Sequence, residues 1–150
     1  MLNTLLYEIA TKEIGVAEIA GLENNFRILH YAKKAGLNWV KDDETSWCGI
    51  FMGFCFAELP EAIRPKHYPK QEAARARSWL DSGAIVPDLN QARTGDVLIF
   101  WRGSPDSWQG HVCLYDSHEG QDILCLGGNQ GNMVKRQHYK KDRLLGIRRY

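Results

Sequence analysis

Residues 42–55 read DDETSWCGIFMGFC and change abruptly from acidic and small polar side chains to an almost unbroken apolar run. An apolar run of this length, closed by Pro60, predicts a buried helix. Thr45 and Ser46 are residue types that cap helix N-termini, so either of them is expected to begin this helix. Cys48 then stands at the front edge of the helix, and this position determines the chemistry we expect from it.

The start of a helix activates a cysteine. The first turn has backbone N–H groups without a partner, and the macrodipole places partial positive charge there. Both stabilise a thiolate at Cys48, which is the nucleophilic form of cysteine. Gly49 leaves room for a substrate carbonyl, and the same N–H groups can form an oxyanion hole. Cys55, about two turns further on, is expected in the core. A purely structural Cys48 is the alternative interpretation.

Composition indicates one ordinary domain spanning residues 1–150, with 44% hydrophobic and 25% charged residues. The net charge is +1, from 19 basic and 18 acidic residues, so nothing in the whole molecule favours nucleic acid. The start of the chain lacks the features of a signal peptide, and no segment could insert in a membrane. Four cysteines are too few for a disulfide scaffold and lack zinc-type spacing. We therefore expect reduced thiols, no metal and no cofactor.

The periodicity of the sequence predicts an α+β fold, with helices first and antiparallel strands after them. The helical patterns occupy the first part of the chain. Three short apolar runs, bounded by turn residues and typical of strands, follow them. The expected helices span residues 4–14, 26–36 and the run at Cys48, with a short fourth helix over 71–83. The expected strands span 95–101, 111–117 and 122–128, and residues 144–150 are expected as an edge strand.

A thiol nucleophile needs a base, and His111 is the best placed of the five histidines. It opens a strand directly after a polar loop, where a side chain can face a cleft. If the following hairpin turns symmetrically about Glu119, His111 faces Gly127 and Asn129 lies diagonally from it. An Asn side chain there could orient the imidazole and fix its tautomer, which is the third role in a Cys-His-Asn set.

The same register predicts that Cys113 faces Cys125. We expect these two to be reduced neighbours in the core, with a disulfide forming only in an oxidising setting. A metal site built on His111 and Cys113 is a further, less favoured interpretation. A histidine at a strand edge can also be incidental, so the combination of cysteine, histidine and asparagine carries the catalytic hypothesis.

Several motifs closely resemble the CHAP and NlpC/P60-type cysteine peptidases and amidases that cut peptidoglycan. They are DETSWCGIFMGFC, ARARSWLDSG, TGDVLIFWRGSPDSWQGHVCLY and LCLGGNQGNMV. The sequence is similar in particular to a phage- and bacteria-associated branch of CHAP-like cell-wall hydrolases. The resemblance covers nearly the whole chain, and the Trp-Cys helix start, the Gly-Asp-Val strand and the Gly-His-Val strand occur in the family's order.

The resemblance implies a papain-like α+β core, with N-terminal helices packed on a small antiparallel sheet. Cys48 would be the nucleophile and His111 the base. CHAP enzymes often place an acid and then an Asn on the strand after the histidine. Here that place reads LGGNQ, without an acid, so Asn129 takes the third role and Gln130 is the second choice. The expected reaction is hydrolysis of an amide bond in the peptide stem, as an endopeptidase or a muramoyl-alanine amidase.

The resemblance also suggests substrate contacts. Trp47, Trp101 and Trp108 would stand near the cleft, and Arg102 could pair with a carboxylate of the stem. Trp108 and Gln109 lie directly before the base in the sequence, which favours them as contacts. Packing in the core is the alternative role for any of these tryptophans.

Three other functions remain open from the sequence. They are a module that binds cell-wall peptide without cutting it, a cysteine peptidase for a protein or another amide, and a structural phage or secretion component. As a hydrolase, the protein is expected to be a monomer made in the cytoplasm and delivered to the wall or periplasm by another system. Candidate deliveries are release as an endolysin, a phage tail, and injection as a secreted effector, for which an immunity protein is a possible partner.

Overall fold

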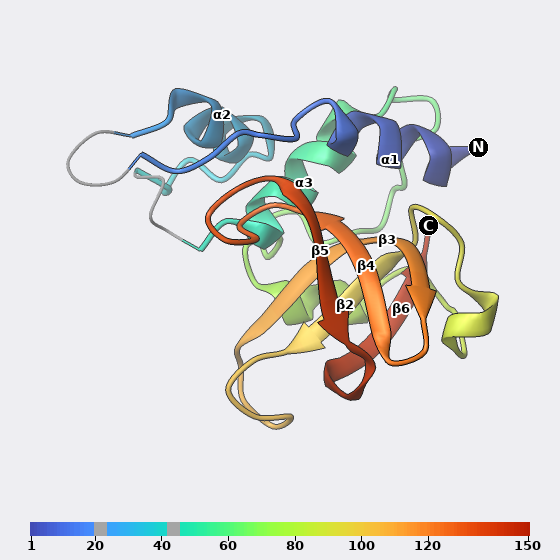
Figure 1. Ribbon diagram of the computed structural model, residues 1–150. Coiled ribbons are helices and arrows are strands. Elements are labelled where there is room, and N and C mark those ends of the chain that lie inside the picture. Colours follow the sequence, from blue (N-terminus) through green and yellow to red (C-terminus); the bar gives the residue numbers. More distant parts are fainter. Residues whose placement is uncertain (20–23, 42–45) are drawn as a thin grey trace.

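The computed structural model describes residues 1–19, 24–41 and 46–150, and it is an α+β fold with helices against one side of a curved antiparallel sheet (Figure 1). The helices are α1 (Leu2–Thr11), α2 (Phe26–Lys34) and α3 (Cys48–Glu58), with 3-10 turns η1 (Ala76–Asp81), η2 (Leu89–Gln91) and η3 (Lys141–Arg143). The strands are β1 (Ala84–Ile85), β2 (Val97–Trp101), β3 (Gly110–Glu119), β4 (Asp122–Gly127), β5 (Lys135–Lys140) and β6 (Leu144–Arg149).

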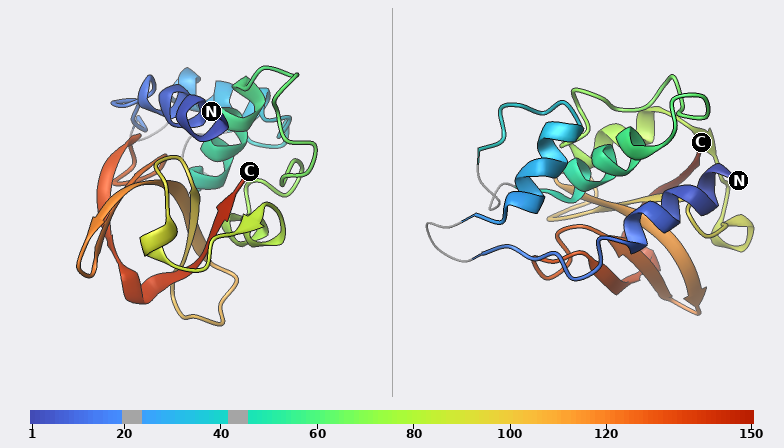
Figure 2. Two further views of the ribbon diagram at one scale, coloured as in Figure 1. Left: turned by 90° about the vertical axis from the view of Figure 1, so that its right-hand side faces the viewer. Right: turned by 90° about the horizontal axis from the view of Figure 1, so that it is seen from above.

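Helix α3 is the centre of the core, because every residue from its first to its ninth is buried. A helix that is apolar on all sides has to be covered on all sides. The α1 and α2 helices cover it on one side and the sheet covers it on the other, as the left-hand view of Figure 2 shows. Gly49 allows the closest approach, since a Cβ there would lie 2.1 Å from the backbone oxygen of Ala73.

The start of α3 differs from the expectation in one respect. Its N-cap residue is Trp47, whose side chain makes no capping hydrogen bond. The predicted cap at Ser46 is therefore wrong, and Thr45, the other predicted cap, lies outside the described residues. Burial of the apolar run, and not a polar cap, fixes where this helix begins. The helix ends at Glu58, shortly before the Pro60 that was expected to close it.

The other predicted helices are confirmed in place but not always in type. The α2 helix falls within its predicted span, whereas α1 begins two residues before the predicted start at residue 4 and ends at Thr11. The side chain of Asn25 caps α2 by accepting from the N–H of Arg27 at 2.8 Å. The predicted helix over residues 71–83 is only the 3-10 turn η1. The described helices include none that is long and apolar enough to cross a membrane.

The sheet has the strand order β1-β6-β2-β3-β4-β5, and every pair is antiparallel. The predicted strand at residues 144–150 exists as β6, but its predicted edge position is wrong because it pairs with both β1 and β2. The outer edge at the other end is β5, which the sequence did not predict. Its residues KRQHYK are mostly charged or polar, so they lack the apolar alternation that indicates a strand.

The β3–β4 hairpin also has a different register from the predicted one. Tyr115 lies opposite Cys125, so Cys113 and Cys125 are not an opposed pair. The turn is formed by residues 120 and 121, with φ of 58° at Gly120, and not by a tip at Glu119. A shift of register at Asp116 adds one residue to β3. Neither the shift nor the turn position can be counted from alternation alone.

The two faces of the sheet carry separate apolar clusters. One face packs against α3 and includes Val97, Ile99, Val112 and Leu114. The other face lies inside the curve of the sheet, where Leu98, Phe100, Cys113 and Ile147 pack under the segment that contains Val86 and Leu89. Alternation along β2 and β3 assigns His111 to this second face, because it pairs with Phe100 across the two strands.

A buried ion pair joins the last strand to the start of β2. The carboxylate of Asp96 is fully buried and accepts from Nε and Nη2 of Arg149 at 2.8 and 2.6 Å. It also accepts from the side chain of Asn3 at 2.7 Å and from the N–H of Arg93 at 2.8 Å. One carboxylate therefore holds together α1, the β2 approach and β6.

We predict that Asp96→Ala lowers the free energy of unfolding by about 3 kcal/mol, because it leaves the Arg149 guanidinium and two further donors without their buried acceptor. Urea denaturation measures this value. The matched control is Asp122→Ala, which breaks the exposed ion pair with Lys140 and should leave the urea midpoint almost unchanged. Equal small effects of both substitutions would show that the buried pair does not hold the fold.

Candidate active site

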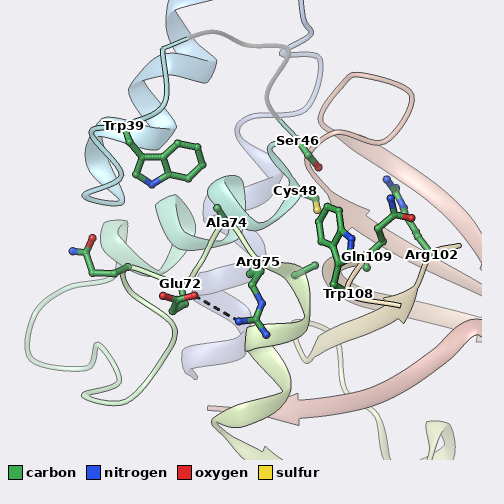
Figure 3. A pocket seen from close by; sticks show the side chains of 12 residues that line it. Trp39, Ser46, Cys48, Glu72, Ala74, Arg75, Arg102, Trp108 and Gln109 are labelled. Carbon is green, nitrogen blue, oxygen red and sulfur yellow. Dashed lines mark ion pairs between the residues drawn. The ribbon is translucent and has the colours of Figure 1, made fainter. Parts of the chain in front are cut away.

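A cleft of about 590 Å³ lies where the start of α3, the segment at residues 71–76 and the loop after β2 meet. Cys48 lies on its wall, together with Arg102, Trp108 and Gln109 from the β2–β3 loop (Figure 3). The structure thus brings four of the predicted site residues to a single cleft. It is also the kind of concave, mixed apolar and polar site that binds small molecules and peptides.

Cys48 is the first residue of α3 and its side chain is only 2% exposed. The first hydrogen bond of the helix runs from the N–H of Phe51 to the oxygen of Trp47, at 2.8 Å. The N–H groups before it therefore have no acceptor within the helix, and Cys48, the first of these residues, lines the cleft. Gly49 does not leave room for a substrate as expected, because its Cα faces the Ala73 backbone.

His111 lies on β3, is fully buried and has polar partners at both ring nitrogens. Its Nε2 is 2.9 Å from Oε1 of Gln130 and 3.1 Å from the hydroxyl of Tyr139. Its Nδ1 is 3.2 Å from Nη2 of Arg102. The ring of Tyr139 also stacks on the imidazole, with centroids 5.0 Å apart. Arg102 is therefore the residue that connects the cleft to this buried base.

The hydrogen bonds of Gln130 determine the tautomer of His111. The Gln130 amide nitrogen donates to the backbone oxygens of Cys125 and Lys135, at 3.3 and 2.6 Å. The amide oxygen must then face His111, and because it can only accept, Nε2 carries the proton. Nδ1 is left with a lone pair, which accepts from the Arg102 guanidinium. The basic nitrogen of His111 is thus occupied by a cation.

The chain brings Gln130, and not Asn129, to His111. Strand β4 ends at Gly127, and Asn129 adopts the left-handed conformation with φ of 55°, so the chain turns before it can continue the pairing. A Cβ on Gly127 would lie 2.9 Å from Oε1 of Gln130, so this glycine leaves the space that the amide needs. Among the described residues, no hydrogen bond joins the Asn129 side chain to His111. The geometry favours the second choice for the third residue.

Burial controls the ionisation of the site. Burial, and then the charge of Arg102, lower the pKa of His111 to about 3, and the hydrogen bond with Gln130 opposes this effect. His111 is therefore neutral at pH 7, the state in which it can accept a proton. Burial also raises the pKa of Tyr139, which remains a neutral phenol. The four cysteines are buried free thiols, and burial raises the pKa of Cys55 and of Cys113.

The tryptophans divide into cleft residues and packing residues. Trp108 is 75% exposed and Trp39 is 59% exposed, and both line the cleft. Trp47 is fully buried, and its Nε1 donates to a carboxylate oxygen of Glu18 at 2.7 Å, so it contacts the core and not the cleft. Trp101 does not line the cleft either, because its indole lies under the guanidinium of Arg143. The core interpretation therefore holds for Trp47.

Sequence reasoning missed four residues of the site: Trp39 and the Glu72–Arg75 pair on the cleft wall, and Tyr139 behind the base. An exposed tryptophan in a polar segment was the one signal for Trp39. Tyr139 occupies an alternate position of a polar strand, where an aromatic residue indicates one covered face. Nothing in the local sequence indicates that residues 72 and 75 face the cleft.

Within residues 1–19, 24–41 and 46–150, no group of three or more His, Cys, Asp or Glu side chains lies close enough together to hold a metal ion. The polar groups around His111 are instead an amide, a phenol and a guanidinium. None of these is a usual ligand of a divalent metal, so the site as built favours chemistry carried by the side chains themselves.

The sequence matches no known family of proteins and has no significant similarity to a curated protein. The resemblance to CHAP and NlpC/P60-type enzymes therefore remains a hypothesis, and the geometry of the cleft is the basis for any functional proposal.

His111 is buried in its neutral form. We therefore predict that the free energy of unfolding decreases as the pH falls below the ordinary pKa of histidine. The pKa is about 6.5 in the unfolded chain and about 3 in the folded protein, so only the unfolded state binds this proton between those values. The contribution of the neutral His111 to the free energy of unfolding is intact above pH 6.5 and is lost as the pH falls below that value. Between pH 7 and pH 5 the loss is about 2 kcal/mol.

The measurement is urea denaturation at pH 7 and pH 5 for the wild type and for His111→Gln. The variant should lack this part of the pH dependence, whatever its stability at pH 7. The pKa values of Glu13 and Asp116 are lowered by hydrogen bonds and neighbouring arginines despite burial, and His111→Gln leaves both groups in place, so the comparison of the two proteins isolates His111. Identical pH dependence in both proteins would contradict a buried neutral His111.

Proposed function

We propose that this protein is a cysteine hydrolase with a papain-like arrangement, which cleaves an amide bond in the peptide stem of peptidoglycan. The observation that carries the proposal is one cleft lined by Cys48 at a helix start and by Arg102, whose guanidinium contacts the buried His111–Gln130 pair. A nucleophile, a base and a residue that orients the base are the three parts of such a mechanism.

The reaction is an acyl transfer in two halves. The Cys48 thiol gives its proton to Nδ1 of His111, and the sulfur attacks the carbonyl carbon of the amide. The C–N bond then breaks, His111 gives the proton to the leaving amine, and the acyl group remains as a thioester. Water, deprotonated by His111, adds to the thioester and releases the acid and the thiol. The free N–H groups at the start of α3 stabilise the oxyanion.

Gln130 supports this assignment because it fixes the reactive face of the imidazole. Its oxygen accepts from Nε2–H, so the lone pair of His111 lies on Nδ1, the nitrogen that faces Arg102 on the cleft side. The neutral amide provides orientation but no negative charge. The imidazolium formed during the reaction is therefore less stabilised than it would be beside a carboxylate, and it readily returns its proton to the leaving amine.

The walls of the cleft suit a peptide that carries charges and a sugar. Trp39 and Trp108 present exposed aromatic surfaces on two walls, and such rings pack against sugar and peptide faces. Arg102 adds a positive charge, which matches a carboxylate of a peptidoglycan stem, whereas the charge of Arg75 is paired with Glu72. A module that binds the stem without cutting it would use the same walls, so the experiment must separate binding from cleavage.

We predict that the wild type releases soluble muropeptides from purified sacculi and that Cys48→Ala releases none, because the thioester cannot form. Mass spectrometry of the fragments distinguishes an amidase from an endopeptidase. The matched control is Cys55→Ala, which removes a buried thiol from the same helix but keeps the nucleophile. It should remain active.

Three results would contradict the cell-wall hydrolase. Fragments from Cys48→Ala would exclude the proposed nucleophile. Binding of wild type to sacculi in a pull-down without any fragments would indicate a binding module. Cleavage of an intact protein substrate but not of sacculi, with the thiol reduced, would indicate a different amide substrate.

We predict that Gln130→Ala lowers kcat by roughly 100-fold, because the imidazole loses the acceptor that fixes its tautomer. Asn129→Gly should retain nearly full activity, and glycine suits the left-handed conformation of that position. The rates are measured on sacculi with both variants verified as folded. A large loss of kcat in Asn129→Gly together with little loss in Gln130→Ala would show that Asn129, and not Gln130, orients the imidazole of His111.

A further inference from the structure

Among the residues that the structure describes, no carboxylate pairs with the Arg102 cation in the cleft. The ion pairs of the described residues include Arg27 with Glu13, Arg136 with Asp116 and Arg149 with Asp96, but none that involves Arg102. The Arg75 on the same cleft wall is paired with Glu72. The Arg102 guanidinium is half-buried in the cleft and carries an unneutralised charge. It can therefore bind an anionic group of a ligand through two parallel hydrogen bonds.

The backbone that carries Arg102 is held independently of its side chain. The guanidinium of Arg77 donates to the backbone oxygens of Ser104, Pro105 and Gln109, at 3.0, 2.8 and 2.8 Å. The N–H of Arg102 itself donates to the oxygen of Gln109 at 3.3 Å. The loop therefore stays in place when the Arg102 side chain changes its rotamer, and only that side chain needs to move.

The position of the guanidinium blocks the proposed reaction in the free protein. Nδ1 of His111 is its basic nitrogen and accepts from Nη2 of Arg102, so the lone pair that must receive the Cys48 proton is already used. A proton on Nδ1 would also place two donors and two positive charges 3.2 Å apart. On the other side of the ring, Gln130 and Tyr139 occupy Nε2. The ring has no second route to accept a proton.

We propose that Arg102 is a cap on the catalytic base, and that a carboxylate of the substrate draws its guanidinium away from Nδ1 of His111 and so allows this nitrogen to take the Cys48 proton. The carboxylate replaces a neutral acceptor by a charged, bidentate one, which is the stronger partner for a guanidinium. The same contact that recognises the substrate thus completes the catalytic pair. The inference rests on the proposed cysteine-hydrolase function and extends it.

The cap defines a substrate class. Arg102 and Cys48 line the same cleft, so the carboxylate must belong to a residue close to the scissile amide (Figure 3). Peptides in which that group is a carboxamide would still bind the walls but would leave the cap on His111. Arg102 is therefore a positioning and specificity residue, and its effect is expected in kcat as well as in KM.

The first test needs no substrate. Neutral iodoacetamide alkylates the native protein at pH 7, and peptide mapping follows Cys48, since this cysteine lines the cleft and the other three do not. Arg102→Met removes the charge and the donors, and it should raise the alkylation rate at Cys48 by about tenfold or more, because the base becomes available to the thiol. Arg102→Lys retains a cation and should lie between the two.

The matched control is Arg143→Met. The guanidinium of Arg143 lies over the ring of Trp101, the residue that precedes Arg102, but Arg143 does not line the cleft. Arg143→Met therefore removes one positive charge from the same region and leaves the cleft wall unchanged. Its alkylation rate should equal that of the wild type. Nitrogen NMR of ¹⁵N-labelled histidine provides a second readout: the titration of His111 should move to higher pH in Arg102→Met and not in Arg143→Met.

A pair of synthetic amides, identical except for a carboxylate or a carboxamide beside the scissile bond, tests the specificity. The wild type should prefer the carboxylate by about tenfold or more in kcat/KM, and Arg102→Met should lose the preference. Equal alkylation rates and equal His111 titrations in wild type and Arg102→Met would overturn the cap. A positive cap result with no cleavage of sacculi would instead keep the cap and reject the cell-wall substrate.

Discussion

The complete burial of α3 is the constraint on which the rest of the structure depends. A helix that is apolar on every side can exist only between two layers, so α1 and α2 must cover it opposite the sheet. Its N-terminus is held at the edge of the sheet by close contacts, since a Cβ on Gly128 would lie 2.6 Å from Cβ of Phe51. Cys48 is therefore positioned by packing, and a side chain positioned in this way does not depend on the conformation of a loop.

The absence of a carboxylate beside His111 has consequences for every charge in the site. An acid in place of Gln130 would favour the imidazolium, whereas the amide only orients the ring. Among residues 1–19, 24–41 and 46–150, the formal charge in contact with the imidazole is that of Arg102, and together with burial it opposes protonation. In the proposed reaction, the energetic balance of proton transfer to His111 is thus controlled from the cleft side, where a ligand can change it.

The sequence allowed α3, the position of Cys48 at its start and the strand of His111 to be predicted, because an apolar run and short alternating segments are local signals. The remainder depended on tertiary structure. The register of β3 and β4 was wrong because the shift at Asp116 leaves no trace in the alternation. The choice between Asn129 and Gln130 depended on a left-handed turn that ends β4. Trp47 looked available to substrate because its burial by Glu18 and the helices comes from residues distant in the chain.

The two halves of the proposed reaction place different demands on Arg102. Both need Nδ1 of His111, first for the Cys48 proton and then for the proton of water. If the substrate carboxylate were on the leaving amine, it would depart with the first product, and the guanidinium would return to His111 before the thioester was hydrolysed. If it were on the acyl group, it would remain in the cleft and keep the base available. Efficient hydrolysis by this site therefore requires the carboxylate on the acyl side of the scissile bond, and a substrate with the opposite arrangement would leave the acyl-enzyme to accumulate.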